Sequence, residues 1–280
     1  MGFSRSEPVP AHTPGRLGVL GWPVLHSRSP AMHRAAFAEL SLEGWSYQLL
    51  PVPPDLFDET VRALPGAGFV GANVTVPHKQ AALALADSAG SATRQIGAAN
   101  TLSFAADGHV HAENTDAPGL IAALPLDPSG KRAVVLGAGG TARAAAWALR
   151  EAGASVAVWN RTPERAHELA ESLGVQAIAS VQPADLLLNC TTVGLEADGN
   201  KPEETLQLWG IDTDLLSRYV CVVDYVYGRR ETQLLRSARR LGVMTVDGQA
   251  LLCEQGAISF ELWTGRPAPR AAMARAVAEA

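Results

Sequence analysis

The segment of residues 132–148, R-A-V-V-L-G-A-G-G-T-A-R-A-A-A-W-A, constrains the fold of this chain more than any other. A short apolar run ends at Gly137 and an alanine-rich run follows two further glycines, which predicts a buried strand, a tight turn and a helix. Such a turn aims the first N–H groups of the helix at an anion, which the helix dipole favours. The spacing G-x-G-x-x-A is typical of dinucleotide-binding turns, although it also occurs in turns that bind nothing.

Three small residues in this turn have separate roles. Gly137 permits the turn, Gly139 has no Cβ to keep a pyrophosphate off the backbone, and Ala142 lets the helix pack closely on the strand. The residues expected to surround a bound cofactor here are Gly137, Ala138, Gly139, Gly140, Thr141 and Ala142.

Strands and helices alternate along the chain, which predicts an α/β fold. Before the turn-rich segment at 126–130, strands are expected at 16–20, 45–49, 69–76, 101–104 and near 110, and helices at 29–40, before 65, at 77–86 and at 117–124. After it, strands are expected at 133–136, 155–159, 185–189, 220–224 and 243–246, with helices at 163–173 and 231–241 and a polar segment at 196–204. This second half suits a doubly wound parallel sheet. The helices expected at 248–263 and from 270 have no strand of their own, so we expect them to pack back on the first domain.

The composition excludes several classes of protein. A chain of 280 residues, 47% hydrophobic and 18% charged, can bury sizeable cores and has no signature of disorder. Its formal net charge of −5 without a basic stripe argues against nucleic acid, and no apolar run approaches the roughly 18 residues of a membrane helix. Three cysteines fit a reducing cytoplasm, and the histidines have no metal-ligand spacing, so we expect a cytoplasmic protein without a bound metal.

The second strand of the dinucleotide unit is expected to end at W-N-R-T, residues 159–162. An acidic residue at this point of the fold binds the adenosine ribose and repels a 2′-phosphate. Here Asn160, Arg161 and Thr162 take its place, and Arg165 follows in the next helical turn. Because a planar guanidinium suits a phosphate dianion, the sequence favours NADP over NAD. The alternative is an ordinary exposed arginine after a strand.

Polar residues of the first half are further candidates, and each also has a structural interpretation. Lys79 lies in the first turn of the helix expected at 77–86, where the dipole disfavours a cation; this placement suits a proton-transferring amine or results from chance. Asp116 precedes A-P-G, where an aspartate is a good N-cap. Ser27 and Ser29 could bind a carboxylate at a helix N-terminus, or Ser29 could cap that helix.

An ordered series of short segments resembles the shikimate dehydrogenase family over nearly the whole chain. In the first half these are H-S-R-S-P-A-M-H at 26–33, G-A-N-V-T-V-P-H-K at 71–79, A-N-T-L around Asn100 and N-T-D ending at Asp116. In the second half they are G-A-G-G-T-A from 137, N-R-T-x-x-R from 160, N-C-T-T-V-G from 189, D-Y-V-Y ending at Tyr227, Q-G from Gln255 and F-E-L-W-T-G from 260. Several are weak singly, but the ordered set is highly specific.

The resemblance implies a function and a role for individual residues. The implied reaction is the reversible NADPH-dependent reduction of 3-dehydroshikimate to shikimate, a step of aromatic amino-acid biosynthesis catalysed by an oxidoreductase. Lys79 and Asp116 match the family's catalytic pair. The matches for ligand binding are Ser27, Ser29 and Tyr227 for the substrate carboxylate, Thr75, Asn100 and Gln255 for the ring hydroxyls, and Gly248 for the nicotinamide amide.

The resemblance also implies the domain organisation. Residues 1–116 and 249–280 are expected to form a substrate-binding domain, and residues 117–248 a Rossmann-type NADP-binding domain. We expect a small-molecule substrate as the partner, neither nucleic acid nor membrane, and a monomer or homodimer. The chain departs from the family at Tyr225 and Leu251, where methionine is common and where the nicotinamide is expected nearby.

Three other functions are weighed against this one. A quinate or aminoshikimate dehydrogenase shares the fold and most of the motifs, and the paired serines favour shikimate only moderately. A methyltransferase also has a glycine turn after a strand, but it usually needs an acid where Asn160 stands. A regulatory module that binds NADP without turnover would not need both Lys79 and Asp116.

Overall fold

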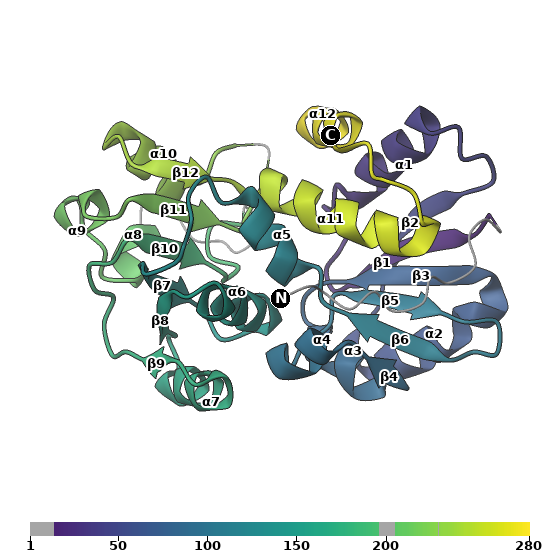
Figure 1. Ribbon diagram of the computed structural model, residues 1–280, viewed down its shortest axis with the longest axis horizontal. Helices are drawn as coiled ribbons and strands as arrows, with labels where there is room; N and C mark the ends of the chain where they lie inside the picture. The colour runs from purple at the N-terminus through teal and green to yellow at the C-terminus, as the bar shows by residue number, and fades with distance from the viewer. Residues whose placement is uncertain (1–13, 196–204, 229) are drawn as a thin grey trace. The chain divides into compact units, whose positions relative to one another are not determined.

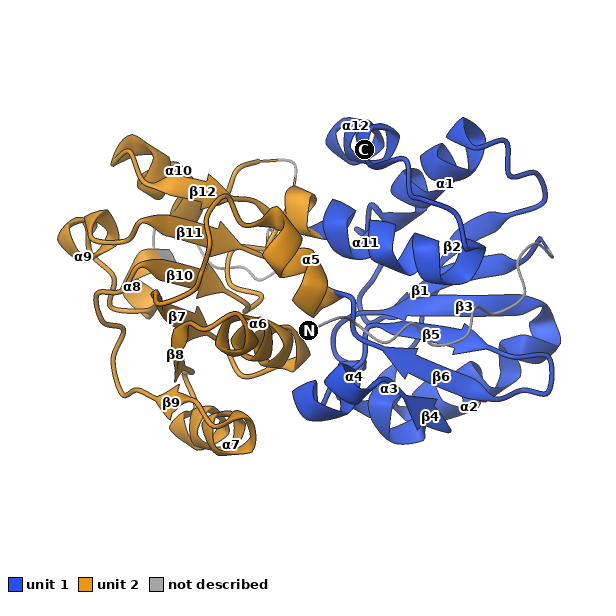
Figure 2. Cartoon of the chain, viewed as in Figure 1, with its two compact units in different colours: residues 1–115, 252–280 blue, residues 116–251 orange. Residues whose placement is uncertain are grey.

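The computed structural model describes residues 14–195, 205–228 and 230–280, which fold into two compact units (Figures 1 and 2). Unit 1 comprises Met1–Thr115 and Leu252–Ala280, and unit 2 comprises Asp116–Leu251. The divisions predicted from the sequence lie after residues 116 and 248, and the ligand expected for each domain stays a prediction. The polar segment expected at 196–204 lies outside the described residues.

Unit 1 contains a mixed six-stranded sheet in the order β2-β1-β3-β5-β6-β4. Its strands are β1 (Arg16–Gly21), β2 (Ser46–Pro51), β3 (Phe69–Val74), β4 (Ser88–Ala89), β5 (Thr101–Phe104) and β6 (Val110–Glu113). Its helices are α1 (Ser29–Glu39), α2 (Phe57–Ala63), α3 (Lys79–Leu85), α4 (Ser91–Ile96), the end of α11 (Gly248–Thr264) and α12 (Arg270–Glu279). β1 is parallel to β2 and β3, whereas β5 is antiparallel to β3 and β6.

Alternating residues of the strands supply two cores, one on each face of this sheet. Leu17 and Val19 of β1 belong to a core that also contains Phe260 of α11 and Met273 of α12. Leu20, on the opposite face, belongs to the core formed with α2 and α3. The period of two is that of a strand buried on both faces. The prediction that the C-terminal helices return to the first domain is therefore confirmed (Figure 1).

Unit 2 contains a parallel six-stranded sheet in the order β12-β11-β10-β7-β8-β9. Its strands are β7 (Arg132–Leu136), β8 (Ser155–Trp159), β9 (Gln176–Ala177), β10 (Leu186–Asn189), β11 (Cys221–Asp224) and β12 (Met244–Val246). Its helices are α5 (Asp116–Ala123), α6 (Gly140–Glu151), α7 (Pro163–Leu173), α8 (Thr205–Leu208), α9 (Thr213–Ser217), α10 (Gln233–Arg240) and the start of α11. The strand order reverses between β7 and β10, so this is the doubly wound arrangement that the sequence predicts.

The structure corrects the predicted N-cap of one helix and the predicted start of another. Ser29 is not the N-cap of α1 but its first helical residue; Arg28 (φ −86°, ψ −2°) is the N-cap residue, and no side chain caps the helix. The helix expected from 77 begins at Lys79, because the chain first makes a turn in which the His78 N–H donates to the Thr75 carbonyl at 2.9 Å. The short elements β9, α8 and α9 are absent from the prediction.

Candidate functional site

The glycine turn of unit 2 joins β7 to α6. Gly137 has φ of +109°, a conformation that residues with a Cβ rarely adopt, and an added Cβ would lie 3.1 Å from Cγ2 of Thr191. Its N–H donates to the Trp159 carbonyl at 2.8 Å, which ties the turn to the end of β8. The turn therefore requires glycine at 137 for its own geometry, independently of any ligand.

Gly139 has a different reason to be glycine. Its backbone is extended (φ −84°, ψ −176°), and a Cβ added there would meet no atom within 4 Å. No side chain caps α6, whose twelve residues begin at Gly140, and Ala142 in its first turn is fully buried. Open space beside a bare backbone at a helix N-terminus fits a pyrophosphate group. The backbone geometry of the turn Gly137–Ala142 therefore leaves room for the pyrophosphate of a dinucleotide.

The residues after β8 form an exposed turn into α7. Asn160 Nδ2 donates to the Thr162 carbonyl at 2.9 Å, and Thr162 is the N-cap residue of the helix. Arg161 and Arg165 are exposed, and neither guanidinium pairs with a carboxylate among the described residues. Two cations at the carboxyl end of the strand next to β7 suit the 2′-phosphate of NADP.

A buried polar cluster fixes the loops that follow β10 and β11. Asp224 is 1% exposed and accepts hydrogen bonds from Asn189 Nδ2 (2.8 Å), the Val226 N–H (3.0 Å) and Thr232 Oγ1 (2.7 Å). Burial raises the pKa of Asp224 to about 6, although these three donors oppose the shift. These hydrogen bonds fix the backbone conformation of the segment that carries Tyr225 and Tyr227.

Tyr225 follows β11 directly, and its hydroxyl is buried without a hydrogen-bond partner among the described residues. Burial raises the pKa of this phenol well above its ordinary value, and Cys190 and Asp116 are close enough to raise it further. A Cβ added at Gly248 would lie 2.6 Å from the Tyr225 carbonyl oxygen, so the start of α11 packs on this residue through bare backbone.

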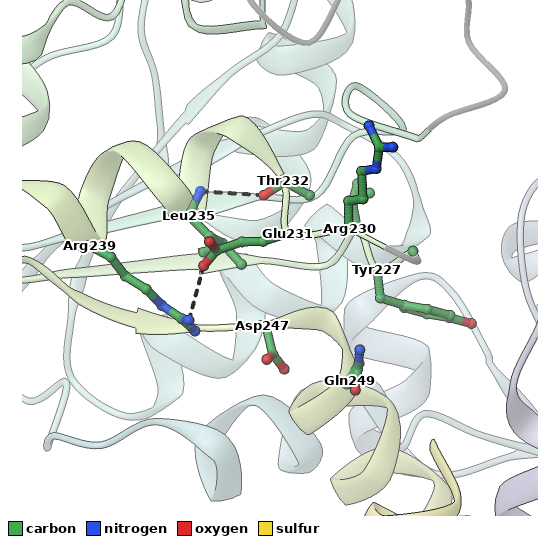
Figure 3. Close-up of a pocket in the computed structure, with 10 residues that line it drawn as sticks. Tyr227, Arg230, Glu231, Thr232, Leu235, Arg239, Asp247 and Gln249 are labelled. Atoms are coloured by element: carbon green, nitrogen blue, oxygen red, sulfur yellow. Dashed lines mark hydrogen bonds and ion pairs between the residues drawn. The ribbon is translucent and has the colours of Figure 1, made fainter. Parts of the chain in front are cut away.

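A pocket of about 140 Å³ opens beside these loops (Figure 3). Tyr227 lines it, together with Arg230, Glu231, Arg239 and further polar side chains of unit 2. Glu231 and Arg239 form an ion pair at 3.0 Å. Tyr227 thus lies at the carboxyl end of the parallel sheet, where ligands of doubly wound folds bind.

In unit 1, two predicted carboxylate-binding serines lie together before and at the start of α1. Ser27 Oγ donates to Ser29 Oγ at 3.2 Å and accepts from the Ser29 N–H at 3.3 Å. Thr75 lies at the corresponding end of β3, where its N–H donates to the Leu20 carbonyl at 2.8 Å. β1 and β3 are parallel, so Thr75 and the segment that leads from β1 to Ser27 and Ser29 leave the sheet at the same edge.

Asn100 is the centre of a buried hydrogen-bond network. Its Oδ1 accepts from the Thr115 N–H at 2.7 Å, and its Nδ2 donates to Thr115 Oγ1 at 2.9 Å and to Gln255 Oε1 at 3.2 Å. Ser259 Oγ lies 2.9 Å from Thr101 Oγ1 and 3.0 Å from Thr115 Oγ1. The two predicted hydroxyl-binding amides, Asn100 and Gln255, are therefore in direct contact.

The network extends to Asn73 on β3. Asn73 Nδ2 donates to Ser259 Oγ at 3.0 Å, and Tyr47 donates to Asn73 Oδ1 at 2.7 Å. Asn73, Thr101, Thr115 and Ser259 have no predicted role at the site. Two signals point to three of them: Asn73 and Thr101 are polar residues in strands, and Ser259 follows Gln255 by one helical turn.

The backbone of Lys79, the first residue of α3, is hydrogen-bonded to the segment that carries this network. The Ala99 N–H donates to the Lys79 carbonyl at 2.8 Å, directly before Asn100 in the chain. The predicted catalytic pair is divided between the units: Lys79 belongs to unit 1, and Asp116, which is 7% exposed, begins α5 of unit 2.

Two histidines of the quoted motifs are structural. His78 stacks on Phe57 with ring centroids 4.4 Å apart, and its Nε2 lies 2.8 Å from the Val52 carbonyl oxygen. His33 stacks on Tyr47 at 4.2 Å, and burial lowers its pKa to about 3. Among the described residues there is no group of three or more His, Cys, Asp or Glu arranged to hold a metal ion. In that part of the chain no helix has the length and apolar character needed to cross a bilayer.

Comparison with known proteins identifies the family. Residues 19–102 match the family model of the shikimate dehydrogenase substrate binding domain, residues 122–192 that of shikimate/quinate 5-dehydrogenase, and residues 251–278 that of the shikimate 5′-dehydrogenase C-terminal domain. A Methanopyrus kandleri protein named shikimate dehydrogenase (NADP(+)) is 40% identical, over 94% of this chain and 94% of its own length. The chain belongs to the shikimate dehydrogenase family.

Two further relatives of this family are similar over most of their length. A Thermus thermophilus protein, also named shikimate dehydrogenase (NADP(+)), is 44% identical over 89% of this chain and 92% of its own. The crystal structure of shikimate 5-dehydrogenase from Thermus thermophilus in complex with NADP(H) and shikimate matches with a TM-score of 0.84 and 40% identity. It covers 94% of this chain and 98% of that protein.

Proposed function

We propose that this protein is an NADP-dependent shikimate dehydrogenase that interconverts 3-dehydroshikimate and shikimate. The observation that carries the proposal is the pairing of two kinds of site in one chain of this family: a glycine turn with open backbone at Gly139 and a network of amides and hydroxyls around Asn100. Relatives with this name, and a structural neighbour with NADP(H) and shikimate bound, support it.

The substrate is a ring that carries one carboxylate and several hydroxyls, so its binding needs directional side chains. Ser27 and Ser29, with Tyr227 of unit 2, are proposed to bind the carboxylate through their hydroxyl groups. Thr75, Asn100 and Gln255 are proposed to bind the ring hydroxyls. The Asn100 amide cannot flip freely, because the Thr115 N–H holds its Oδ1 at 2.7 Å.

NADPH supplies a hydride to the ring carbonyl carbon when it is bound. The Lys79 ammonium is proposed to donate the accompanying proton from Nζ to the carbonyl oxygen, and in the oxidative direction the amine takes it back. Asp116 is proposed as its partner in the catalytic pair. The carboxylate of Asp116 is buried at 7% exposure, so its negative charge is little screened by water.

The proposed cofactor groups are the turn Gly137–Ala142 for the pyrophosphate, Asn160, Arg161, Thr162 and Arg165 for the 2′-phosphate, and Gly248 for the nicotinamide amide. We further propose the cytoplasm as its compartment, in keeping with Cys190, Cys221 and Cys253, none of which forms a disulfide bond.

The test is a nicotinamide absorbance assay with NADPH and 3-dehydroshikimate, run beside 3-dehydroquinate and aminodehydroshikimate. We expect oxidation of NADPH with 3-dehydroshikimate and a kcat/KM at least about tenfold lower with the other two. A preference for 3-dehydroquinate or aminodehydroshikimate would establish the quinate or aminoshikimate alternative instead. Tight binding of NADPH without turnover of any of the three would identify a cofactor-sensing module.

A further inference from the structure

Tyr225 leaves a buried polar group unsatisfied. Its hydroxyl has no hydrogen-bond partner among the described residues, although the atom is removed from solvent. Tyr47 and Tyr219 are buried, and the hydroxyl of each donates to an acceptor: Asn73 Oδ1 and the Gln182 carbonyl, both at 2.7 Å. A buried hydroxyl without a partner lowers the stability of the fold. Tyr225 has such a hydroxyl, whereas Tyr47 and Tyr219 do not, and a bound ligand that accepts its hydrogen bond would explain the difference.

The position of Tyr225 indicates which part of a ligand it would meet. The residue follows β11, the strand second from β7 on the side away from β8. A doubly wound fold binds one mononucleotide on each side of the point where the strand order reverses. The arginines proposed for the adenosine 2′-phosphate follow β8, so the nicotinamide half belongs to the side of β10, β11 and β12.

The neighbours of the Tyr225 side chain lie on that same side. Cys190 follows β10 and Asp116 begins α5, and both are near enough to act electrostatically on the phenol. Gly248 packs against the Tyr225 carbonyl, 2.6 Å from an added Cβ. Burial among these groups raises the pKa of Tyr225 well above its ordinary value, so the phenol keeps its proton and acts as a donor.

We propose that the Tyr225 hydroxyl donates a hydrogen bond to the carboxamide oxygen of the nicotinamide ring. The carboxamide oxygen is a neutral acceptor on this half of the cofactor, and a directed bond to it fixes the rotation of the ring. Tyr225 is then a cofactor-positioning residue that is satisfied only when the cofactor is bound. This inference rests on the proposed function, because it requires NADP as the ligand.

The test compares Tyr225→Phe with Tyr219→Phe, a control from the same unit whose hydroxyl has an acceptor in the free protein. Calorimetric titration with NADP⁺ is expected to show a Kd about five- to tenfold higher for Tyr225→Phe and unchanged for Tyr219→Phe. Adenosine 2′,5′-bisphosphate, which lacks the nicotinamide half, is expected to bind both variants and the unaltered protein equally. Without ligand, Tyr225→Phe is expected to keep or raise the melting temperature, whereas Tyr219→Phe lowers it.

Three outcomes would overturn the inference while leaving the proposed function intact. NADP⁺ affinity could stay the same in Tyr225→Phe, or both NADP⁺ and the bisphosphate could weaken equally, or the free variant could lose as much stability as Tyr219→Phe. A Tyr225→Phe protein that binds shikimate more weakly but NADP⁺ normally would assign the hydroxyl to the substrate and overturn it too. Failure of the unaltered protein to bind NADP⁺ would overturn the proposed function itself, and the inference with it.

Discussion

The two units prepare their candidate sites in different ways. In unit 1 the site groups are side chains that hydrogen-bond to one another: Asn100 contacts Thr115 and Gln255, and Ser259 links Thr115 to Asn73. In unit 2 the corresponding surface is largely backbone, with the open space at Gly139 and the close packing of Gly248 on Tyr225. One buried hydroxyl of unit 2, that of Tyr225, has no hydrogen-bond partner among the described residues.

This difference follows from the ligands proposed for the two units. A small ring with several hydroxyls offers donors and acceptors at fixed angles, so its amides must be held in one orientation beforehand. A pyrophosphate is an anion with many equivalent oxygens, which helix-start N–H groups can meet without any side chain. We therefore expect truncation of side chains to reduce activity most in unit 1. In unit 2, replacing a glycine by alanine should weaken cofactor binding most.

Lys79→Ala tests the expectation that side chains dominate the site of unit 1, and it should have the largest effect on activity. Loss of the proposed proton donor should lower kcat by roughly a hundredfold or more, and the KM for the ketone substrate should change less. Steady-state kinetics measures both values, and Lys131→Ala, in the connection before β7, is the control expected to stay near the unaltered rate. A kcat within about threefold and a raised KM would make Lys79 a binding residue.

The buried titratable groups should give the two units opposite pH dependences. The folded pKa of Asp224 is raised to about 6, so its stabilising contribution is present below about pH 4 and is lost as the pH rises through 6. The free energy of unfolding of the unaltered protein, minus that of Asp224→Asn, should therefore fall by about 2 kcal/mol between pH 4 and pH 7. Chemical denaturation at several pH values measures this difference.

His33 provides the contrast in unit 1. Burial lowers its folded pKa to about 3, so its contribution is present above about pH 6.5 and is lost as the pH falls. The corresponding difference for His33→Phe should slope in the opposite direction from that for Asp224→Asn. Two flat profiles, or two of the same sign, would contradict this contrast.

The sequence predicts local elements well where proline and glycine punctuate them. The bounds of β8 and α7 agree with the prediction, because Pro163 opens the helix after the strand and Gly174 ends it. The N-cap of α1 is predicted wrongly, because Ser29 is already helical and Arg28 precedes the helix, and nothing in the residue type reveals that.

The site is predicted less completely than the fold. The motif residues Asn100 and Gln255 stand out in the sequence, and the structure places them in contact. Their supporting residues do not stand out, because the Thr115–Ser259 contact joins positions 144 residues apart. The sequence likewise does not reveal that the Tyr225 hydroxyl lacks a partner among the described residues, because this depends on which acceptors the folded chain places near it.

Gly139→Ala tests the backbone half of the comparison. A Cβ there meets nothing within 4 Å and the backbone is extended, so the melting temperature should not change. The added methyl would occupy the space proposed for the pyrophosphate, so the Kd of NADP⁺ should rise by tenfold or more, about 1.4 kcal/mol. Gly137→Ala is the matched contrast: at φ of +109° it should lower stability. An unchanged Kd in Gly139→Ala would show that the pyrophosphate lies elsewhere.

Arg161→Ala tests an exposed side chain of unit 2. Loss of the guanidinium proposed for the 2′-phosphate should lower kcat/KM with NADPH by about tenfold and leave the value with NADH nearly unchanged. Arg132→Ala, an exposed arginine at the start of β7, is the control. Equal use of NADPH and NADH by the unaltered protein would contradict the proposed phosphate contact, whatever the variant does.

Ser259→Ala tests the supporting network of unit 1 and has the smallest expected effect. Ser259 Oγ contacts Asn73, Thr101, Thr115 and the backbone carbonyl of Gln255, but neither of the side-chain amides proposed to bind substrate, so it acts only by holding them in place. Its loss removes several hydrogen bonds from a buried network whose other members keep further partners, and should lower the free energy of unfolding by about 1 kcal/mol. It should also raise the KM for shikimate about threefold to fivefold, with kcat and the KM for NADP⁺ nearly unchanged.

The control for this effect is Thr264→Ala in the same helix. Thr264 is equally buried, and its hydroxyl donates to the Phe260 carbonyl at 2.7 Å. This variant should lose stability as well, but it should leave the KM for shikimate unaltered because no contact of the Thr264 hydroxyl leads to Asn100. If both variants raised KM equally, general loosening of α11 would be the cause, and the network would not be what orients the amides of unit 1.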